Sequence, residues 1–212
     1  MTKVLSIVCL IILFGSCDLK SDEEQIKEVY ENYKNAILDD DAELAVSFID
    51  NNTEEYFNDI LFHVINSDSI EISNLPTYDK MTIMIVRHTI EDEIILDLDG
   101  KTLFQTLISD EFIDRQSILY TGIGEVTVSG NDAFGNLLVN DEESIFGYDF
   151  HRINDVWKID VSSIFEPTDI VLRDIVNEQN LTDIEYIFQS IEIKSGSYPD
   201  STIWIPVGKN GL

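Results

Sequence analysis

Four ionisable side chains that alternate along two neighbouring segments have the residue types for acid–base chemistry. They are Asp149, His151, Lys158 and Asp160. A turn at Asn154 and Asp155 would pair the two segments as a β-hairpin, with residues 153 and 156 as partners. His151 then lies beside Lys158, and on the same face the two carboxylates lie side by side. Facing carboxylates repel each other, and burial of such a pair raises one pKa, as a general acid or base requires.

The opposite face of this hairpin collects the apolar side chains, which are Tyr148, Phe150, Trp157, Ile159 and Val161, with Arg152 covering the Trp. A slip of one residue would exchange the two faces, so the pattern fixes the register. Because this face is the one that the core takes, we interpret the four ionisable residues as an exposed charged ladder. In that ladder, diagonal pairs of Asp149 with Lys158 and of His151 with Asp160 offset the repulsion. A pocket that uses these four residues is the alternative.

Other candidates for chemistry lack the spacing that a site needs. Zinc sites have close spacings such as HExxH, whereas the histidines of this chain are far apart, at His63, His88 and His151. Gly122 and Gly124 form a lone GxG, which predicts a bulge in a strand rather than a phosphate loop. Ser162 and Ser163 lie in no nucleophile elbow. We therefore expect no catalytic residue, no metal and no cofactor.

Charge and cysteine content narrow the class of protein. The chain has 13 Lys and Arg against 41 Asp and Glu, a formal net charge of -28, and the acids are scattered. Such a surface repels phosphate backbones, so we expect no nucleic acid as a partner. A hydrophobic fraction of 44% argues against disorder. The only cysteines are Cys9 and Cys17, so the rest of the chain has neither a disulfide nor a thiol nucleophile.

The first seventeen residues have the pattern of a secretion leader. Lys3 precedes an apolar run from Val4 to Phe14, which is shorter than the roughly 20 residues of a membrane-spanning helix. Gly15 and Ser16 before Cys17 resemble the lipobox of bacterial lipoproteins, with Phe14 where an aliphatic residue is usual. The resemblance implies a signal peptide over residues 1–16, cleavage between Ser16 and Cys17, and lipidation of Cys17. An ordinary buried N-terminal element with an incidental cysteine is the alternative.

Residues 17–21 would then form the lipidated cysteine and its tether. Several acyl chains, such as palmitate, are enough to hold a protein on a membrane without help from the protein surface. Lys20 and Ser21 followed by acidic residues are similar to a surface-export signal of lipoproteins in one group of Gram-negative bacteria. This implies the cell envelope, with the outer membrane and its surface as the expected place. A solvated tether that runs into a helix cap explains the same residues.

Apolar residues at helical spacing predict helices in the first half of the chain, over about 21–37, 44–49, 52–65 and 103–108. Ser21 and Glu24 form a capping box for the first, and Asn52 with Glu55 is expected to begin the third. Residues 66–74 are polar and are expected to form a loop. In residues 79–90 the β-branched content favours a strand, but Met81, Met84 and the next turn share one helical face. We predict a helix there.

From residue 117 the pattern changes to strands. Segments 118–128 and 133–139, with a turn near Gly130, precede the hairpin and complete a four-stranded antiparallel meander. Helical spacing returns over 167–176 and 182–191, with Gly196 as the expected stop. The prolines of residues 198–207 exclude a regular helix, so this segment is expected to wrap as a tail. Helices followed by an antiparallel sheet predict an α+β fold.

The segments EVYENYKNAI, DAELAV and NDVWKIDV, in this order, resemble the nuclear transport factor 2-like superfamily, which includes ketosteroid-isomerase-like and SnoaL-like proteins. DGKTLF and the segment from LP to VRH are similar to secreted or lipid-anchored bacterial members. The resemblance covers residues 22–165 and implies a cone-shaped fold, in which helices cover a curved meander and leave a pocket. Residues 166–212 form an added helical extension and tail. The Tyr and Asp constellation of the family's enzymes cannot be placed on this sequence.

Three hypotheses for function remain open. The first is a lipid-anchored, non-catalytic envelope protein that binds a small apolar ligand or a protein partner. The second is an isomerase-like or dehydratase-like enzyme, which needs a buried Asp or His in the pocket with a hydrogen-bonded Tyr. The third is a partner-blocking, immunity-type protein whose acidic surface captures a basic protein, which needs the acids gathered on one face.

Overall fold

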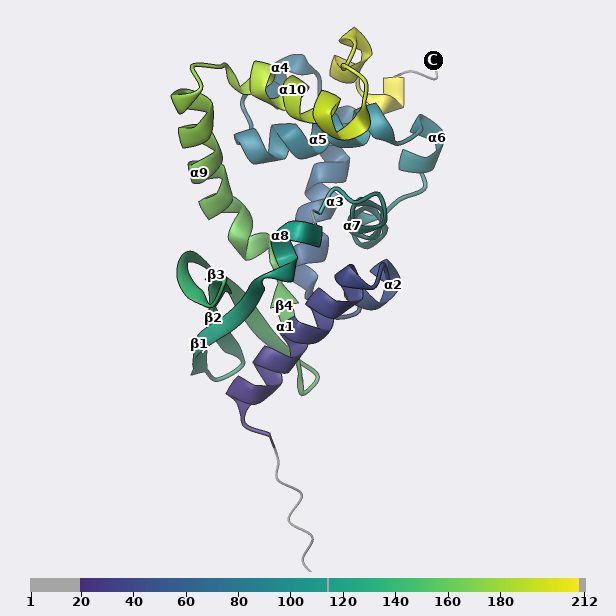
Figure 1. Ribbon diagram of the computed structural model, residues 1–212. Helices are drawn as coiled ribbons and strands as arrows, with labels where there is room; N and C mark the ends of the chain where they lie inside the picture. The colour runs from purple at the N-terminus through teal and green to yellow at the C-terminus, as the bar shows by residue number, and fades with distance from the viewer. Residues whose placement is uncertain (1–19, 114, 210–212) are drawn as a thin grey trace, which may run out of the picture.

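The fold is seen in a computed structural model that describes residues 20–113 and 115–209 (Figure 1). Helices come first: α1 (Asp22–Leu38), α2 (Ala42–Ala45), α3 (Asn51–Asn66), α4 (Ser69–Ser73), α5 (Thr77–Thr89), α6 (Asp92–Ile95), α7 (Gly100–Ser109) and α8 (Arg115–Leu119). Four strands follow: β1 (Thr121–Ser129), β2 (Asp132–Val139), β3 (Glu142–Ile153) and β4 (Val156–Asp160). The chain ends with the 3-10 turn η1 (Val161–Ile164), α9 (Phe165–Glu178), α10 (Asp183–Ser195), η2 (Ser201–Trp204) and η3 (Val207–Lys209).

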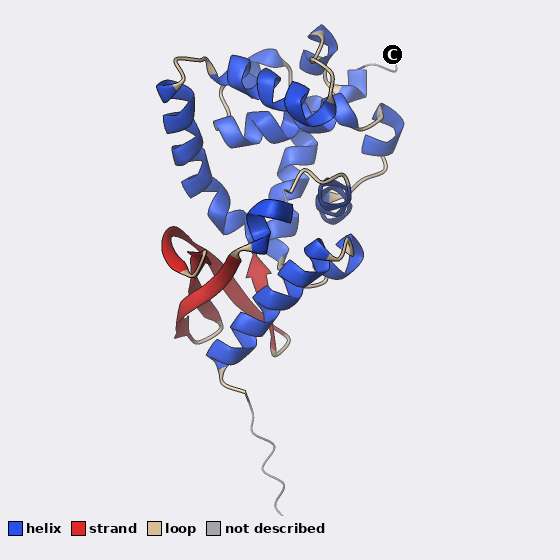
Figure 2. Cartoon of the chain, viewed as in Figure 1, coloured by secondary structure: helices blue, strands red, loops and turns tan. Residues whose placement is uncertain are grey.

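The predicted α+β class and the meander are confirmed. The sheet has the order β1-β2-β3-β4, with antiparallel neighbours throughout. It lies at one end of the molecule against α1, while the other helices stack beyond it (Figure 2). The curved meander that the resemblance implied is not observed, because the sheet is not strongly curled. The signal peptide, Ser16 and Cys17 of the lipobox lie outside the described residues.

The β3–β4 hairpin has the predicted register. Ile153 pairs with Val156, and the partners further along include Phe150 with Ile159 and His151 with Lys158. Asn154 and Asp155 both have positive φ, 52° and 63°, which is the turn geometry that matches the twist of two antiparallel strands. The bulge predicted at the two glycines of β1 is also present, as a register shift between Ile123 and Val126.

The start of α1 is fixed to this hairpin. Ser21 and Glu24 form the predicted capping box, and Asp22 in the first turn makes an ion pair with Arg152 of β3. The Arg152 guanidinium lies 4.5 Å from the ring centroid of Trp157, which is 1% exposed. The Arg152 guanidinium is the largest of the influences that lower the pKa of Asp22. These contacts hold α1 across the sheet, where Tyr30, Tyr33 and Ile37 are buried.

Several expectations for local structure were wrong. The second helix, predicted over about residues 44–49, is α2 and ends at Ala45. Residues 66–74 contain α4, because Asp68 caps it and Glu71 completes a capping box. The third helix begins earlier than predicted, since its N-cap is Asp50 and not Asn52. Strand β1 begins at Thr121 rather than near residue 118, and α8 precedes it.

The C-terminal helices are present as predicted. Thr182 and Glu185 form a capping box for α10, and Gly196, with φ of 77°, ends it. The following residues form only short 3-10 turns, with Ile203 and Val207 buried as anchors. No helix in the described ranges is long and apolar enough to cross a membrane.

Candidate functional site

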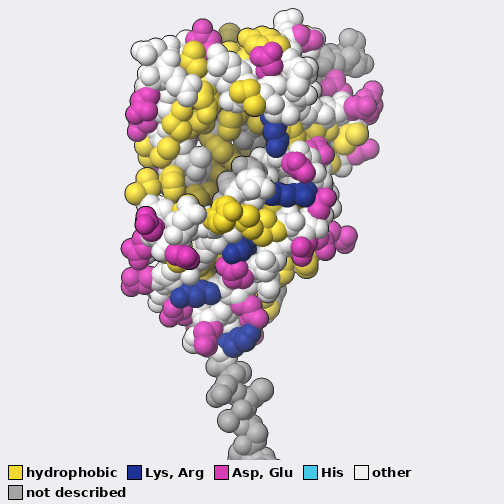
Figure 3. Space-filling view, in the orientation of Figure 1, with side chains coloured by type: hydrophobic (Ala, Val, Ile, Leu, Met, Phe, Trp, Pro, Cys, Tyr) yellow, Lys and Arg dark blue, Asp and Glu magenta, His cyan; other side chains and the backbone are white. Residues whose placement is uncertain are grey.

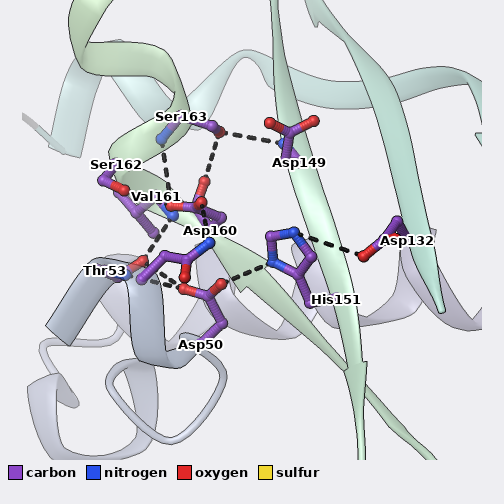
Figure 4. Close-up of polar contacts among 10 residues, drawn as sticks. Asp50, Thr53, Asp132, Asp149, His151, Asp160, Val161, Ser162 and Ser163 are labelled. Carbon is purple, nitrogen blue, oxygen red and sulfur yellow. Dashed lines mark hydrogen bonds and ion pairs between the residues drawn. The ribbon is translucent and has the colours of Figure 1, made fainter. Parts of the chain in front are cut away.

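Asp149, His151 and Asp160 lie together at the hairpin (Figure 4), and Lys158 pairs with His151 on the same face of the sheet, as predicted. An acid outside the hairpin contacts the His151 imidazole. Asp50 is the N-cap of α3, and its Oδ2 atom lies 2.7 Å from Nδ1 of His151. Nε2 of His151 lies 3.8 Å from a carboxylate oxygen of Asp132. The imidazole therefore lies between a buried carboxylate and an exposed one.

Asp50 reaches this position because the segment before α3 pairs with the outer edge of β4. The backbone N–H of Asp50 donates to the Ile159 carbonyl at 2.9 Å, and the Ile159 N–H donates to the Phe48 carbonyl at 3.0 Å. Oδ1 of Asp50 accepts from the N–H and the hydroxyl of Thr53. The Thr53 hydroxyl in turn accepts from the Val161 N–H at 2.8 Å. This network joins α3 to the end of the sheet.

The prediction of an exposed ladder is wrong for Asp160, which is only 6% exposed. Its Oδ2 accepts from Asn52 at 3.0 Å, and its Oδ1 accepts from the Ser162 hydroxyl and the Ser163 N–H. Lys158 does not bridge to a carboxylate: its ammonium donates to the Ser47 carbonyl. The Asp149 residue as a whole is exposed. Its carboxyl group nevertheless loses part of its hydration to neighbouring atoms, and this desolvation, followed by the nearby Asp160 charge, raises its pKa.

The Asp50, His151 and Asp160 side chains have ligand atoms within 4.8 Å of one another, a geometry that a cation could use. Each of these atoms, however, is already engaged in hydrogen bonds. A cation would have to break the contact between Asp50 and His151 and the Asn52 or serine contacts of Asp160. We therefore interpret the cluster as structural, because its hydrogen bonds connect the start of α3 to the sheet. Neither it nor Lys158 lines the cavity described next.

A separate apolar cavity of about 570 Å³ lies between the helices and the sheet. Its size is within the range of ordinary small-ligand sites. The lining comes from α1, α3, α5, α7, the segment around α8, the sheet and the start of α9, and comprises Tyr30, Tyr33, Phe57, Tyr78, Met81, Thr82, Ile85, Phe104, Leu107, Phe112, Ile113, Ile118, Thr121, Leu137, Val139, Tyr148, Val161, Ile164 and Phe165. Figure 3 shows the hollow open on the face drawn, with hydrophobic side chains around it.

Phenol groups provide the main polarity of this cavity. Tyr30 and Tyr33 come from α1, Tyr78 from α5 and Tyr148 from β3. Burial is the main cause that raises the pKa of all four, to about 12 for Tyr30, and the nearby phenols add to the effect for Tyr33 and Tyr148. All four therefore stay neutral at physiological pH. Among the described lining residues there is no Asp, Glu, His, Lys or Arg.

A partly buried Tyr and Asp pair does exist, but it lies outside the cavity lining. The Tyr56 hydroxyl donates to Oδ1 of Asp79 at 2.6 Å. Burial raises the pKa of Asp79, while the hydrogen bond from Tyr56 partly opposes that rise. The ring centroids of Tyr56 and Phe165 lie 4.7 Å apart. The other aromatic neighbours of Phe165 are Phe57 and Tyr78, which line the cavity. Neither Tyr56 nor Asp79 lines the cavity, so this pair does not place an acid or base beside a bound molecule.

The helical spacing over residues 21–37 and the alternation of the hairpin point Tyr30, Tyr33 and Tyr148 inward, where a filled core would be expected. Helical and strand periodicity show which way a side chain points, but they do not show whether the space that it meets is filled. For Asp50 no local signal was available, because Asp and Asn are equally good N-caps and the Glu three residues after Asn52 favours Asn52 as the helix start. Comparison of the chain with protein-family models, with curated proteins and with solved structures gives no match.

Proposed function

We propose that this protein is a lipid-anchored protein of the bacterial cell envelope whose domain binds a small apolar molecule in the cavity without chemical change. The cavity carries the proposal: it is open, and its walls are mainly aliphatic and aromatic. Binding sites for small molecules combine such walls with a few polar groups. A filled core has few voids larger than a water molecule, so a space of this size needs a reason.

The fold relationship that we propose is with the nuclear transport factor 2-like superfamily, for residues 22–165. Support comes from the order of helices and meander and from the position of the cavity between them. Residues 166–212 are proposed as an addition, and α9 at its start closes one side of the same cavity through Phe165. The outer membrane and its surface are the proposed location.

The structure offers less support for the other two hypotheses, an enzyme and an immunity-type protein. An isomerase-like or dehydratase-like enzyme needs an acid or base facing the ligand, and the described cavity lining presents none. An immunity-type partner needs acids gathered on one face. On the face drawn in Figure 3, Asp and Glu side chains are spread around the molecule rather than gathered.

A tryptophan at the cavity mouth tests the ligand site. Val139 lines the cavity and is 39% exposed, so Val139→Trp should obstruct entry without overpacking the core. We expect the purified protein to bind the neutral apolar dye N-phenyl-1-naphthylamine saturably, at one equivalent per chain. The variant should bind it at least about tenfold more weakly, a loss of about 1.4 kcal/mol. Fluorescence titration measures both affinities.

The matched control is Val128→Trp, on the same sheet at 38% exposure but outside the cavity lining. It should leave the dye affinity unchanged. Equal losses in both variants, or binding without saturation, would show that the dye adheres to exposed apolar surface and would remove the support for a ligand site.

Replacing Cys17 by Ser tests the anchor. If Cys17 carries the lipid, cells fed labelled palmitate should label the parent protein and not the variant, which should leave the membrane fraction. Anchoring by several acyl chains is stable, so the loss should be nearly complete. Membrane attachment and label that persist in the variant would contradict the proposed lipidation.

A further inference from the structure

The hydrogen-bond arrangement inside the cavity indicates which kind of molecule it takes, and this step rests on the proposed ligand-binding function. The Thr121 hydroxyl donates its only proton to the Ile118 carbonyl at 2.6 Å. The contact of 2.7 Å between Tyr30 and Thr121 must therefore use the proton of Tyr30. The Thr82 hydroxyl donates to the Tyr78 carbonyl at 3.0 Å. These three hydroxyl protons are already used.

The hydroxyl protons of three other phenols are not donated in any hydrogen bond. Within the described part of the chain, the hydroxyls of Tyr33, Tyr78 and Tyr148 have no hydrogen-bond partner, and their oxygens are not sealed away from the cavity space. Their mutual influence, which contributes to the raised pKa values of Tyr33 and Tyr148, indicates that the hydroxyls lie near one another. Water can pair with these hydroxyls while the cavity is empty. A ligand that displaces this water without offering an acceptor would leave each donor unpaired at a cost of about 1–3 kcal/mol, so a ligand with an acceptor is favoured.

Charge limits the identity of that acceptor. A carboxylate or phosphate in the cavity would meet no cation among the described lining residues, and burial of an unpaired charge is costly. Lys34, which reaches the backbone beside the cavity, is engaged by the Thr121 carbonyl at 2.8 Å and by the Glu31 carboxylate at 2.7 Å. An alcohol would add a further hydrogen-bond donor to the three phenol donors that already lack an acceptor. An ester brings two oxygens and no donor.

We propose that the cavity binds an uncharged lipophile whose polar end is an ester, held by hydrogen bonds from the hydroxyls of Tyr33, Tyr78 and Tyr148. The apolar walls from α5, α7 and β2 enclose the hydrocarbon part of the molecule. The three phenols come from three different elements, so the ester end also ties α1, α5 and β3 together.

The test uses three probes with nearly the same chain: methyl decanoate, undecane and decanoate. Each displaces N-phenyl-1-naphthylamine from the purified protein at pH 8, where decanoate is ionised. Methyl decanoate should bind at least about tenfold more tightly than undecane, because each of three hydrogen bonds adds a net factor of about 2–10. Decanoate should bind at least about tenfold more weakly than methyl decanoate.

Single variants then assign the preference to the phenols. Tyr33→Phe, Tyr78→Phe and Tyr148→Phe should each weaken methyl decanoate by about 3–10-fold and leave undecane unchanged or slightly tighter. The matched control is Tyr198→Phe, which removes a hydroxyl from an exposed ring outside the cavity. It should change neither affinity.

The outcomes distinguish ligand binding in the cavity from its preference for an ester. Failure of the dye to bind would overturn the proposed ligand-binding function itself. Dye binding with equal affinity for methyl decanoate and undecane, or with decanoate the tightest of the three, would leave ligand binding in place and overturn the ester assignment. Loss of undecane binding in the three Phe variants would likewise contradict it, since the rings and not the hydroxyls would then be responsible.

Discussion

Replacing Arg87 by alanine is expected to lower the free energy of unfolding by about 3–5 kcal/mol. The guanidinium of Arg87, on α5, donates to four backbone carbonyls. Three belong to the end of α3 and the residue after it, at His63, Val64 and Ser67, and the fourth is Ile203 in the tail. Helix ends leave carbonyls without intrahelical partners, and here one side chain supplies the donors. Urea unfolding followed by circular dichroism measures the change.

Two variants show whether the fork of donors is responsible. Burial lowers the pKa of Arg87 to about 10, so the side chain is still charged at neutral pH. Arg87→Lys keeps that charge but cannot reach four carbonyls in a planar fork, so it should recover only part of the loss. Arg173→Ala, at an ion pair with Asp169 whose Arg side chain is 56% exposed, should cost less than about 1 kcal/mol. Similar losses for Arg87→Ala and Arg173→Ala would refute the assignment.

Arg87 illustrates what the sequence could not provide. The apolar periodicity of residues 79–90 was enough to predict the helix, although β-branched residues also favoured a strand. It placed Met81 and Met84 on one helical face, and in the structure Met84 is buried while the half-buried Met81 lines the cavity. Arg87 lies near the end of that helix, where a basic residue is ordinarily explained by the helix dipole. Its actual partners come from α3 and from a tail more than a hundred residues away, and no local pattern reports that contact.

The hairpin was predicted to the residue because its information is local. Alternation fixes the faces, and Asn154 with Asp155 fixes the turn. The burial of Asp160 was missed for the opposite reason: the cover over that face comes from Asp50 and Asn52, which are more than a hundred positions away in the chain. The cavity was beyond prediction in the same way. A void is a property of how six or more segments fail to fill a space, not of any one segment.

The largest steric effect is expected at Gly100, where α7 begins against the side of α3. A Cβ on this residue would lie 2.3 Å from the Glu54 carbonyl oxygen and 2.6 Å from the Asn58 backbone nitrogen. The Gly100 N–H also donates to the Asn58 side chain at 2.7 Å. Backbone atoms cannot move aside as a flexible side chain can. Gly100→Ala should therefore separate the two helices and lower the free energy of unfolding by about 2–4 kcal/mol.

From sequence alone, Asp99 and Gly100 together have the composition of a turn. In the structure Asp99 is the N-cap and Gly100 the first residue of α7, and the glycine is needed for the close approach of two helices rather than for a positive φ. Gly122→Ala is the matched control, because its Cβ would meet only a Glu31 side-chain oxygen at 3.8 Å. It should change stability by no more than about 0.5 kcal/mol.

The same substitution should also reach the cavity. Phe57 of α3 and Phe104 of α7 stack with ring centroids 4.6 Å apart, and both line the cavity wall. If Gly100→Ala pushes α7 away from α3, this stacked pair opens, and the folded variant should bind N-phenyl-1-naphthylamine more weakly than the Gly122→Ala control. A variant with parental stability would show that the helices have room to move apart. A variant that is destabilised but binds the dye normally would show that the strain is relieved away from the cavity wall.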